Sequence, residues 1–258
     1  MKKEDRAGII IQARMGATRL PAKMVRPFHD GKGVLELLLQ RLNSRFALRR
    51  DVAMVVATTV NPSDDLIAEV ADKCNFPVFR GSEEDVLGRF IDAAASAGVA
   101  KLIRVCADNP FLDMDALDEL INRITVQPHD YIAFSRSDGT PTIKTHYGFW
   151  PEVVRLDALR RVADTTAEKL YHEHVTNYIY THPEGFEIDL IPIPRAIEEN
   201  GNIRLTLDTL EDFEMQRTIY ARCMERHGRI DISSVLETLD TFPDFYEQMK
   251  QQILLNTK

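Results

Sequence analysis

Three cations closely follow the first apolar run of this chain. Residues 9–11 are all isoleucine, and Arg14, Arg19 and Lys23 come soon after them, with Gly16 in between. A buried strand that ends in a loop of free backbone N–H groups and fixed cations can hold a polyphosphate, because arginine grips phosphate oxygens in pairs. A solvated basic loop has the same composition. Spacing alone therefore leaves both interpretations open.

Two carboxylates follow later apolar runs. Asp108 comes after the run at residues 101–106, and Asp208 comes directly after the run at 203–207. Ligands of open α/β sheets bind at the carboxyl ends of strands, and Mg²⁺ takes one or two carboxylates together with phosphate oxygens and water. Asp108 can instead form a turn with Asn109, and Asp208 can cap the next helix. Two such aspartates, each closing a predicted strand, favour a shared metal site.

A third segment suited to ligand binding spans residues 79–90. Ser82 and Asp85 follow a short apolar run there, at the start of a predicted helix. Backbone N–H groups at a helix start attract a polar or anionic ligand. The same two residues can also act locally, as a helix cap and as a complement to the helix dipole. Thr58, at the end of the preceding predicted strand, is a further candidate for the same pocket.

Together these segments resemble the CMP-sugar synthetases, the cytidylyltransferases that activate Kdo and neuraminic acids, and in particular the branch named for spore coat polysaccharide biosynthesis protein F. The loop of this family runs Gln-Ala-Arg-x-x-Ser-x-Arg-Leu-Pro-x-Lys, and the matching positions are Gln12, Ala13, Arg14, Arg19, Leu20, Pro21 and Lys23. A family segment of the form Arg-Gly-Ser-x-x-Asp-Val-Leu-x-Arg matches residues 80–89. A third, Gly-Asp-x-Pro-Leu-Ile-Asp, matches residues 107–113, with Ala107 in place of the glycine.

The resemblance implies an α/β fold with a doubly wound, mostly parallel sheet, of the Rossmann-like nucleotidyltransferase type. It implies CTP as donor, Mg²⁺ as cofactor and a small Kdo- or nonulosonate-like sugar acid as acceptor, with release of pyrophosphate, for surface polysaccharide biosynthesis. The implied catalytic residues are Arg14, Arg19, Lys23 and Asp108, and the implied metal ligands are Asp108 and Asp208. The residues expected to bind the nucleotide are Ala13, Arg14, Met15, Gly16, Thr18, Arg19, Lys23, Thr58, Arg80, Gly81, Ser82 and Asp85.

The chain departs from the family in the region expected to meet the acceptor. Relatives carry Gly-Leu-Asp-Val-Glu-Val-Phe where this chain has residues 148–154, so that Trp150 stands at the position of the Asp while Glu152 is retained. An aromatic side chain in place of a carboxylate changes acceptor recognition. We expect Trp150 and Glu152 to face the acceptor, although ordinary packing also explains a tryptophan.

A second expected acceptor segment lies at residues 172–176. The family carries Arg-Glu-His-Val-Thr there, and this chain matches Glu173 and His174, with His172 in place of the Arg. We assign Glu173 and His174 to the acceptor side or to an interface, with helix packing as the alternative. The His-x-His pair does not indicate zinc, because residues two apart on a helix point to nearly opposite sides.

Two other functions remain compatible with the sequence. A metal-dependent glycosyltransferase uses the same sheet and carboxylates but takes a nucleotide-sugar as donor. A non-catalytic nucleotide-binding homologue would keep the loop without turnover, and Ala107 and Trp150 leave that alternative open. Incubation with free CTP separates the three, because only the synthetase releases pyrophosphate.

The composition narrows the class of protein. The chain has 258 residues, 44% hydrophobic and 28% charged, with a formal net charge of −8, which argues against a nucleic-acid partner because such surfaces need a basic stripe. Three scattered cysteines indicate a reducing compartment rather than disulfides. Neither a signal-like apolar run at the N-terminus nor a stretch of membrane-spanning length is present. We expect a cytoplasmic homodimer without a membrane partner.

The elements that must position these residues alternate in type through the first half of the chain. Alternating strands and helices imply crossover units and a parallel sheet with helices on both faces. The predicted strands are Gly8–Ala13, Val52–Thr58, Pro77–Phe79, Lys101–Cys106 and Tyr131–Phe134. The predicted helices are Val34–Phe46, Ser63–Cys74, Glu83–Ala97 and Met114–Ile124.

The pattern changes in the second half. We expect a single domain over residues 1–258, in which residues 138–201 form a substrate-facing or dimer-forming insertion. The predicted strands there lie within Thr145–Val154, at Phe186–Ile193 and at Ile203–Leu207. The predicted helices are Leu156–Ala163, Ala167–Thr181, a long helix capped by Thr209 and Asp212 that runs to about His227, and two helices within Ile232–Leu255.

Overall fold

A seven-stranded sheet forms the centre of the computed structural model, which describes residues 6–17, 19–126 and 128–256. The strand order is β5-β4-β1-β6-β8-β7-β9, and every neighbouring pair is parallel except the two that involve β8. The predicted doubly wound, mostly parallel sheet is therefore confirmed. The strands are β1 (Ala7–Gln12), β4 (Val52–Thr59), β5 (Val78–Gly81), β6 (Lys101–Cys106), β7 (Tyr131–Ser135), β8 (Glu152–Arg155) and β9 (Ile188–Pro192), with a separate hairpin of β2 (Pro27–His29) and β3 (Lys32–Gly33).

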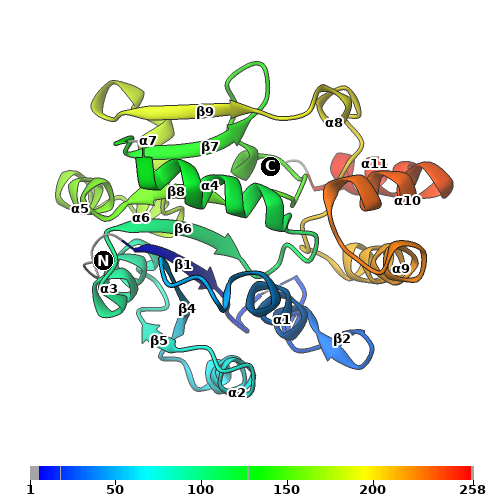
Figure 1. Cartoon of the computed structure of the whole chain (residues 1–258), viewed down its shortest axis with the longest axis horizontal. Helices are drawn as coiled ribbons and strands as arrows, with labels where there is room; N and C mark the ends of the chain where they lie inside the picture. Colours follow the sequence, from blue (N-terminus) through cyan, green and yellow to red (C-terminus); the bar gives the residue numbers. More distant parts are fainter. Residues whose placement is uncertain (1–5, 18, 127, 257–258) are drawn as a thin grey trace.

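Helices cover both faces of this sheet (Figure 1). The α-helices of the first half are α1 (Val34–Phe46), α2 (Asp65–Lys73), α3 (Val86–Ala97) and α4 (Met114–Val126). Those of the second half are α5 (Leu156–Thr165), α6 (Lys169–Glu173), α7 (Asn177–Thr181), α8 (Arg195–Glu199), α9 (Leu210–His227), α10 (Ile232–Thr241) and α11 (Asp244–Leu255). Short 3₁₀ helices are η2 (Pro62–Asp64), η3 (Thr142–Lys144) and η4 (Pro183–Gly185).

Two hydrophobic cores, one on each face, hold the layers together. Helices α1, α2, α4 and α9 contribute to one core, and α3, α5 and α7 contribute to the other. Because both faces are covered, the central strand β1 is apolar without alternation, and Ile9, Ile10 and Ile11 are all fully buried. The predicted helix Val34–Phe46 is confirmed as α1, and its apolar residues form a stripe that is buried against the sheet.

Two elements differ from the sequence prediction. Residues 203–207 are buried as expected but form no strand of the sheet, because their amides bond to loops: Leu205 N–H donates to the carbonyl of His146 at 2.7 Å, and Leu207 N–H to that of Asp108 at 3.1 Å. The single helix predicted over 167–181 is broken into α6 and α7. Thr176 is buried at the break, where its hydroxyl donates to Glu152.

The start of α3 also lies later than predicted. Asp85 is the N-cap and its carboxylate accepts the amide of Gly88 at 2.9 Å, so the helix begins at Val86 instead of Glu83. The cap predicted for the long helix α9 is confirmed, since Thr209 and Asp212 form a full capping box. Within the described part of the chain, no helix is long and apolar enough to cross a membrane.

Candidate functional site

A cavity of about 960 Å³ opens at the carboxyl ends of β1 and β6. The loop after β1, the loop after β6 and the segment that ends at Asp208 line one side, and residues 142–150 and 170–180 line the other. Its cationic side chains are Arg14, Arg19, Lys23, Arg104 and Lys144, and its carboxylates are Asp108, Glu173 and Asp208. The fold thus brings the cations of the first loop and both predicted metal ligands to one place.

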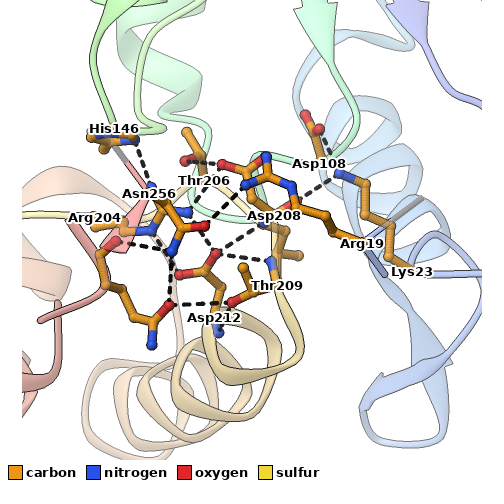
Figure 2. Close-up of polar contacts among 12 residues, drawn as sticks. Arg19, Lys23, Asp108, His146, Arg204, Thr206, Asp208, Thr209, Asp212 and Asn256 are labelled. Carbon is orange, nitrogen blue, oxygen red and sulfur yellow. Dashed lines mark hydrogen bonds and ion pairs between the residues drawn. The ribbon is translucent and has the colours of Figure 1, made fainter. Parts of the chain in front are cut away.

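Lys23 joins three separate segments at this cavity (Figure 2). Its ammonium group donates to the Asp108 carboxylate at 2.8 Å and to the Leu207 carbonyl at 2.6 Å, and the side chain is almost fully buried. A buried cation needs such partners, because desolvation is costly unless it is paired and hydrogen-bonded. Lys23 therefore neutralises Asp108 and holds the first loop against the segment that leads to Asp208.

Asp208 is held by a buried arginine. Arg204 is fully buried and donates to Asp208 at 3.1 Å, to both oxygens of Asp212 at 2.8 Å each, and to Nδ1 of His146 at 2.7 Å (Figure 2). Asp212 also accepts the backbone amides of Asp208 and Thr209, at the start of α9. Asp208 is thereby fixed at the cavity by a helix start and a charged network. Arg204 was not identified from the sequence, although a lone arginine within an apolar run indicates a buried ion pair.

Arg19 has the most exposed position of the three predicted cations. Its guanidinium lies 3.7 Å from Asp208 and donates to Asn256 at 3.0 Å (Figure 2). More than half of the side chain is solvent-exposed, so this contact is weak in the absence of a ligand. Of the other loop residues predicted to bind the nucleotide, Arg14 and Gly16 line the cavity, whereas Ala13 is buried in the core and Met15 packs against it. Thr18 lies outside the described residues.

The donor set at the cavity suits a hard divalent cation. Asp108 and Asp208 both line it and supply carboxylate oxygens, which Mg²⁺ prefers, and Mg²⁺ commonly completes its shell with phosphate oxygens and water. The described residues contain no group of three or more His, Cys, Asp or Glu side chains arranged to hold a metal ion. The two aspartates therefore fit a metal that arrives with a phosphate ligand better than a permanent all-protein site.

A buried carboxylate that the sequence analysis missed anchors the first loop. Asp64 accepts the backbone amide of Met15 at 2.6 Å, the hydroxyl of Thr58 at 3.0 Å, and the hydroxyl and amide of Thr59 at 2.5 and 3.1 Å. Burial acts to raise the pKa of Asp64, but these hydrogen bonds outweigh it and lower the pKa below its ordinary value. Thr58 is thus committed to Asp64, and no cavity lining by Thr58 is found among the described residues.

No residue of the segment 80–85, which was predicted to bind the nucleotide, is part of the cavity lining, although the Glu83 carboxylate lies beside the lining residue Gly16, 3.5 Å from where a Cβ would stand. Arg80 donates to the carbonyls of Thr59 and Asn61 at 2.9 Å each and pairs with Asp65 at 2.6 Å. The Ser82 hydroxyl accepts the amide of Asp85 at 3.0 Å. Gly81 packs closely against Arg89, whose side chain a Cβ on Gly81 would meet at 3.0 Å.

The acceptor residues predicted from the sequence fall into two groups. Trp150, Glu173 and His174 line the cavity, and Trp150 stacks on Phe134 with ring centroids 5.8 Å apart. Glu152 does not line it. Its carboxylate is 3% exposed and accepts from Arg104 at 2.7 Å, from the Tyr131 hydroxyl at 2.5 Å and from Thr176 at 2.9 Å.

Gly148 allows the wall that carries Trp150 to approach the segment before Asp208. Its φ of +71° lies in the left-handed region, and a Cβ there would meet the Leu205 carbonyl oxygen at 2.5 Å. A side chain at position 148 would therefore push apart the two segments that meet at His146 and Leu205.

The chain is similar to known proteins over almost its whole length. Residues 8–256 match the model of the family described as cytidylyltransferase. The chain is 35% identical over 237 residues to the spore coat polysaccharide biosynthesis protein SpsF of Bacillus subtilis (strain 168), covering 91% of this chain and 94% of that protein.

Solved structures show the same fold. A cytidylyltransferase from Leptospira borgpetersenii superposes with a TM-score of 0.78 at 27% identity, over 93% of this chain and 96% of its own. A CMP:2-keto-3-deoxy-manno-octonic acid synthetase complexed with CTP superposes with a TM-score of 0.59 at 14% identity, over 84% and 98% of the two chains.

Proposed function

Since this chain belongs to the cytidylyltransferase family and is a nucleotidyltransferase, we propose that it transfers CMP from CTP to a small acidic sugar and releases pyrophosphate. The observation that carries the proposal is the meeting of Lys23, Asp108 and Asp208 at one cavity. The B. subtilis relative is named for polysaccharide biosynthesis, and one structural relative is named for a keto-deoxy sugar acid and was solved with CTP. The first name supports an acceptor destined for a surface polysaccharide, and the second supports an acidic sugar as that acceptor.

The residues of the first loop would stabilise the charge that develops on the leaving group. In the proposed reaction the oxygen of an acceptor hydroxyl bonds to the α-phosphorus and its proton passes to water, while the bond from that phosphorus to the α–β bridging oxygen breaks and pyrophosphate leaves. Arg14, Arg19 and Lys23 line the cavity and would contact the β- and γ-phosphates. No protein nucleophile is needed, because positioning and preorganised charge lower the barrier.

Asp108 and Asp208 would hold Mg²⁺, which when bound supplies charge neutralisation at the phosphates. Lys23 is paired with Asp108, and Arg19 lies near Asp208. Two of the three predicted phosphate-binding cations are thus next to a carboxylate, and a bound triphosphate would give both members of each pair a new partner.

The test is pyrophosphate release from free CTP with Mg²⁺ and an acceptor panel that includes 2-keto-3-deoxy-manno-octonic acid. Asp108→Asn should lower the rate on the order of 10²–10³-fold, as the loss of a preorganised electrostatic group does. The control is Asp115→Asn, which removes an exposed carboxylate of α4 that pairs with Arg45, and it should leave the rate unchanged. Full Mg²⁺-dependent release by Asp108→Asn would overturn the proposal, as would transfer from a nucleotide-sugar without pyrophosphate release.

A further inference from the structure

The wall of the cavity where the acceptor is expected contains two cations that lie outside the first loop. Arg104 extends from β6, and Lys144 ends the 3₁₀ helix η3. Neither belongs to the loop that would hold the triphosphate. They line the cavity together with Trp150, Thr176 and Tyr180, on the side where the acceptor is expected.

Arg104 is built into the wall. Its side chain is 9% exposed, and its guanidinium donates to Glu152 at 2.7 Å and to the side-chain oxygen of Gln12 at 3.1 Å. Burial acts to lower the pKa of Arg104, but nearby Cys106 and Glu152 outweigh it and raise the pKa, so the group is always charged. A guanidinium carries five N–H donors, and its buried Nε has no hydrogen-bond partner. The arginine is therefore held rigidly and still has unused donor capacity.

Glu152 fixes where this guanidinium lies. One of its oxygens accepts from both Arg104 and the Thr176 hydroxyl, and the other accepts from Tyr131. The cross-strand pairing of Arg104 with Glu152 between β6 and β8 places the two opposite each other in the sheet. The segment between α6 and α7, which carries Thr176, is thereby tied to Arg104. Glu152 is a positioning residue for this wall.

Lys144 adds a second positive charge to this wall, whereas Glu152 neutralises that of Arg104. Its ammonium group lies 5.7 Å from the ring centroid of Tyr180, and no carboxylate pairs with it among the described residues. Burial and the nearby Glu152 raise the pKa of Tyr180 to about 12, so this ring stays a neutral phenol between the two cations. This wall therefore contains the Arg104 guanidinium, whose charge Glu152 neutralises and which has N–H groups left to donate. It also contains the Lys144 ammonium, which lies beside the aromatic ring of Tyr180.

We propose that Arg104 and Lys144 together bind the carboxylate of the acceptor and select an acidic sugar over a neutral one. Arg104 donates hydrogen bonds from a fixed direction, Lys144 balances the charge, and Trp150 packs against the apolar side of the sugar. The proposal rests on the proposed function for the identity of the cavity as the transfer site. It assigns acceptor recognition to two residues that the sequence motifs did not mark and explains why Glu152 is buried behind them.

The single tryptophan provides a binding signal that does not depend on turnover, because Trp150 is the only tryptophan of the chain and lines this wall. The protein is titrated, with CTP and without a divalent cation, using 2-keto-3-deoxy-manno-octonic acid and its methyl ester as probes. The wild type should bind the acid about tenfold or more tightly than the ester, the size expected for a charge-assisted hydrogen bond. Lys144→Met should bring the two affinities close together, whereas Lys144→Arg should keep the preference.

Lys144 is exposed, so its replacement leaves the fold intact, and Lys73→Met on the exposed face of α2 is the matched control. Arg104→Lys keeps a cation opposite Glu152 and should raise the acceptor KM about tenfold while the CTP KM stays constant. Equal binding of acid and ester by the wild type, no binding of the acid, or an unchanged preference in Lys144→Met would each overturn this proposal. Charge-selective binding that depends on Lys144, with no pyrophosphate release from any acceptor, would instead support it and overturn the proposed transfer.

Discussion

The two sides of the cavity are held in place by different means. On the side of the first loop, the candidate site residues pair with one another, as Lys23 does with Asp108 and Arg19 with Asp208. On the side where the acceptor is expected, Arg104 and Thr176 of the lining bind a buried carboxylate, Glu152, that does not line the cavity itself. The first arrangement leaves charged pairs that a phosphate ligand can rearrange. The second gives a wall whose geometry is set before any ligand binds.

This difference separates residues that meet a ligand from residues that support them. A motif is recognisable in sequence where the binding residues lie close together along the chain, as Arg14 to Lys23 do. A support such as Glu152 gathers partners from β6, β7 and the segment between α6 and α7, which are far apart in sequence. If the two sides are held in place separately, substitution of Glu152 should lower the free energy of unfolding. Substitution of Asp64, which anchors the first loop, should weaken ligand binding on the side of that loop alone.

The largest effect on stability is expected from Glu152→Gln. Removing this charge leaves Arg104 buried without its counterion, and breaking a buried pair in this way costs about 3–5 kcal/mol of unfolding free energy. The control is Glu119→Gln, which breaks an exposed pair with Arg123 on α4 and should cost about 1 kcal/mol or less. Denaturant unfolding measures both. A loss below about 1 kcal/mol in Glu152→Gln would show that the wall does not depend on this pair.

A smaller effect, confined to the other side, is expected from Asp64→Ala. The variant leaves the Met15 and Thr59 amides without an acceptor, at a cost of about 1–3 kcal/mol for such buried donors. Because the pKa of Asp64 is lowered in the folded protein, its contribution is present above the ordinary pKa of an aspartate and is lost as the pH falls through the lowered value.

CTP affinity should fall in Asp64→Ala while the Trp150 fluorescence response to the acid probe stays unchanged. Asp72→Ala, an exposed aspartate of the same helix region, is the control and should change neither. Equal loss of CTP binding and of acid binding would mean that the two sides of the cavity are not supported separately.

Most of the fold could be predicted from the sequence because the spacing of apolar residues along the chain determines its helices and strands. Apolar residues at helical spacing indicated α1, and a continuous apolar run indicated β1. Both elements are present, and their apolar residues are buried. Residues 203–207 were predicted as a strand for the same reason, but burial does not specify a partner. Their amides bond to His146 and Asp108, and only the folded chain brings those loops together.

The candidate site was recognisable to the extent that its residues are close in sequence or match a family motif. Asp64 and Arg204 were not identified from the sequence because their roles depend on partners that are distant along the chain. Asp64 lies 49 positions from Met15, and Arg204 lies 58 positions from His146. Glu152 was marked by its motif but for a different role, since a retained carboxylate looks the same in sequence whether it meets a ligand or an arginine. Only the geometry at Arg104 separates the two roles.

The smallest effect on stability is expected where His172 of α6 contacts the start of α3, beside the cavity wall where the acceptor is expected. Its ring nitrogens lie 2.9 Å from the Thr166 carbonyl and 2.8 Å from the Asp85 carboxylate, and the backbone contact with Thr166, followed by that with Asp85, raises the pKa of His172. A pKa raised by folding means that the stabilisation is fully present below the ordinary histidine pKa and is lost as the pH rises through the raised value.

The stabilisation from His172 should be below about 1 kcal/mol, because the pair is partly exposed and therefore screened. Unfolding free energies of the wild type and of His172→Gln should accordingly differ at pH 5.5 and converge by pH 8.5, with His129→Gln as the histidine control. A difference that stays constant with pH would assign the contact to hydrogen bonding alone. Because α6 carries Glu173 at the cavity rim, convergence accompanied by weaker acid binding at pH 8.5 would show that the docking of α6 on α3 helps to shape the acceptor wall.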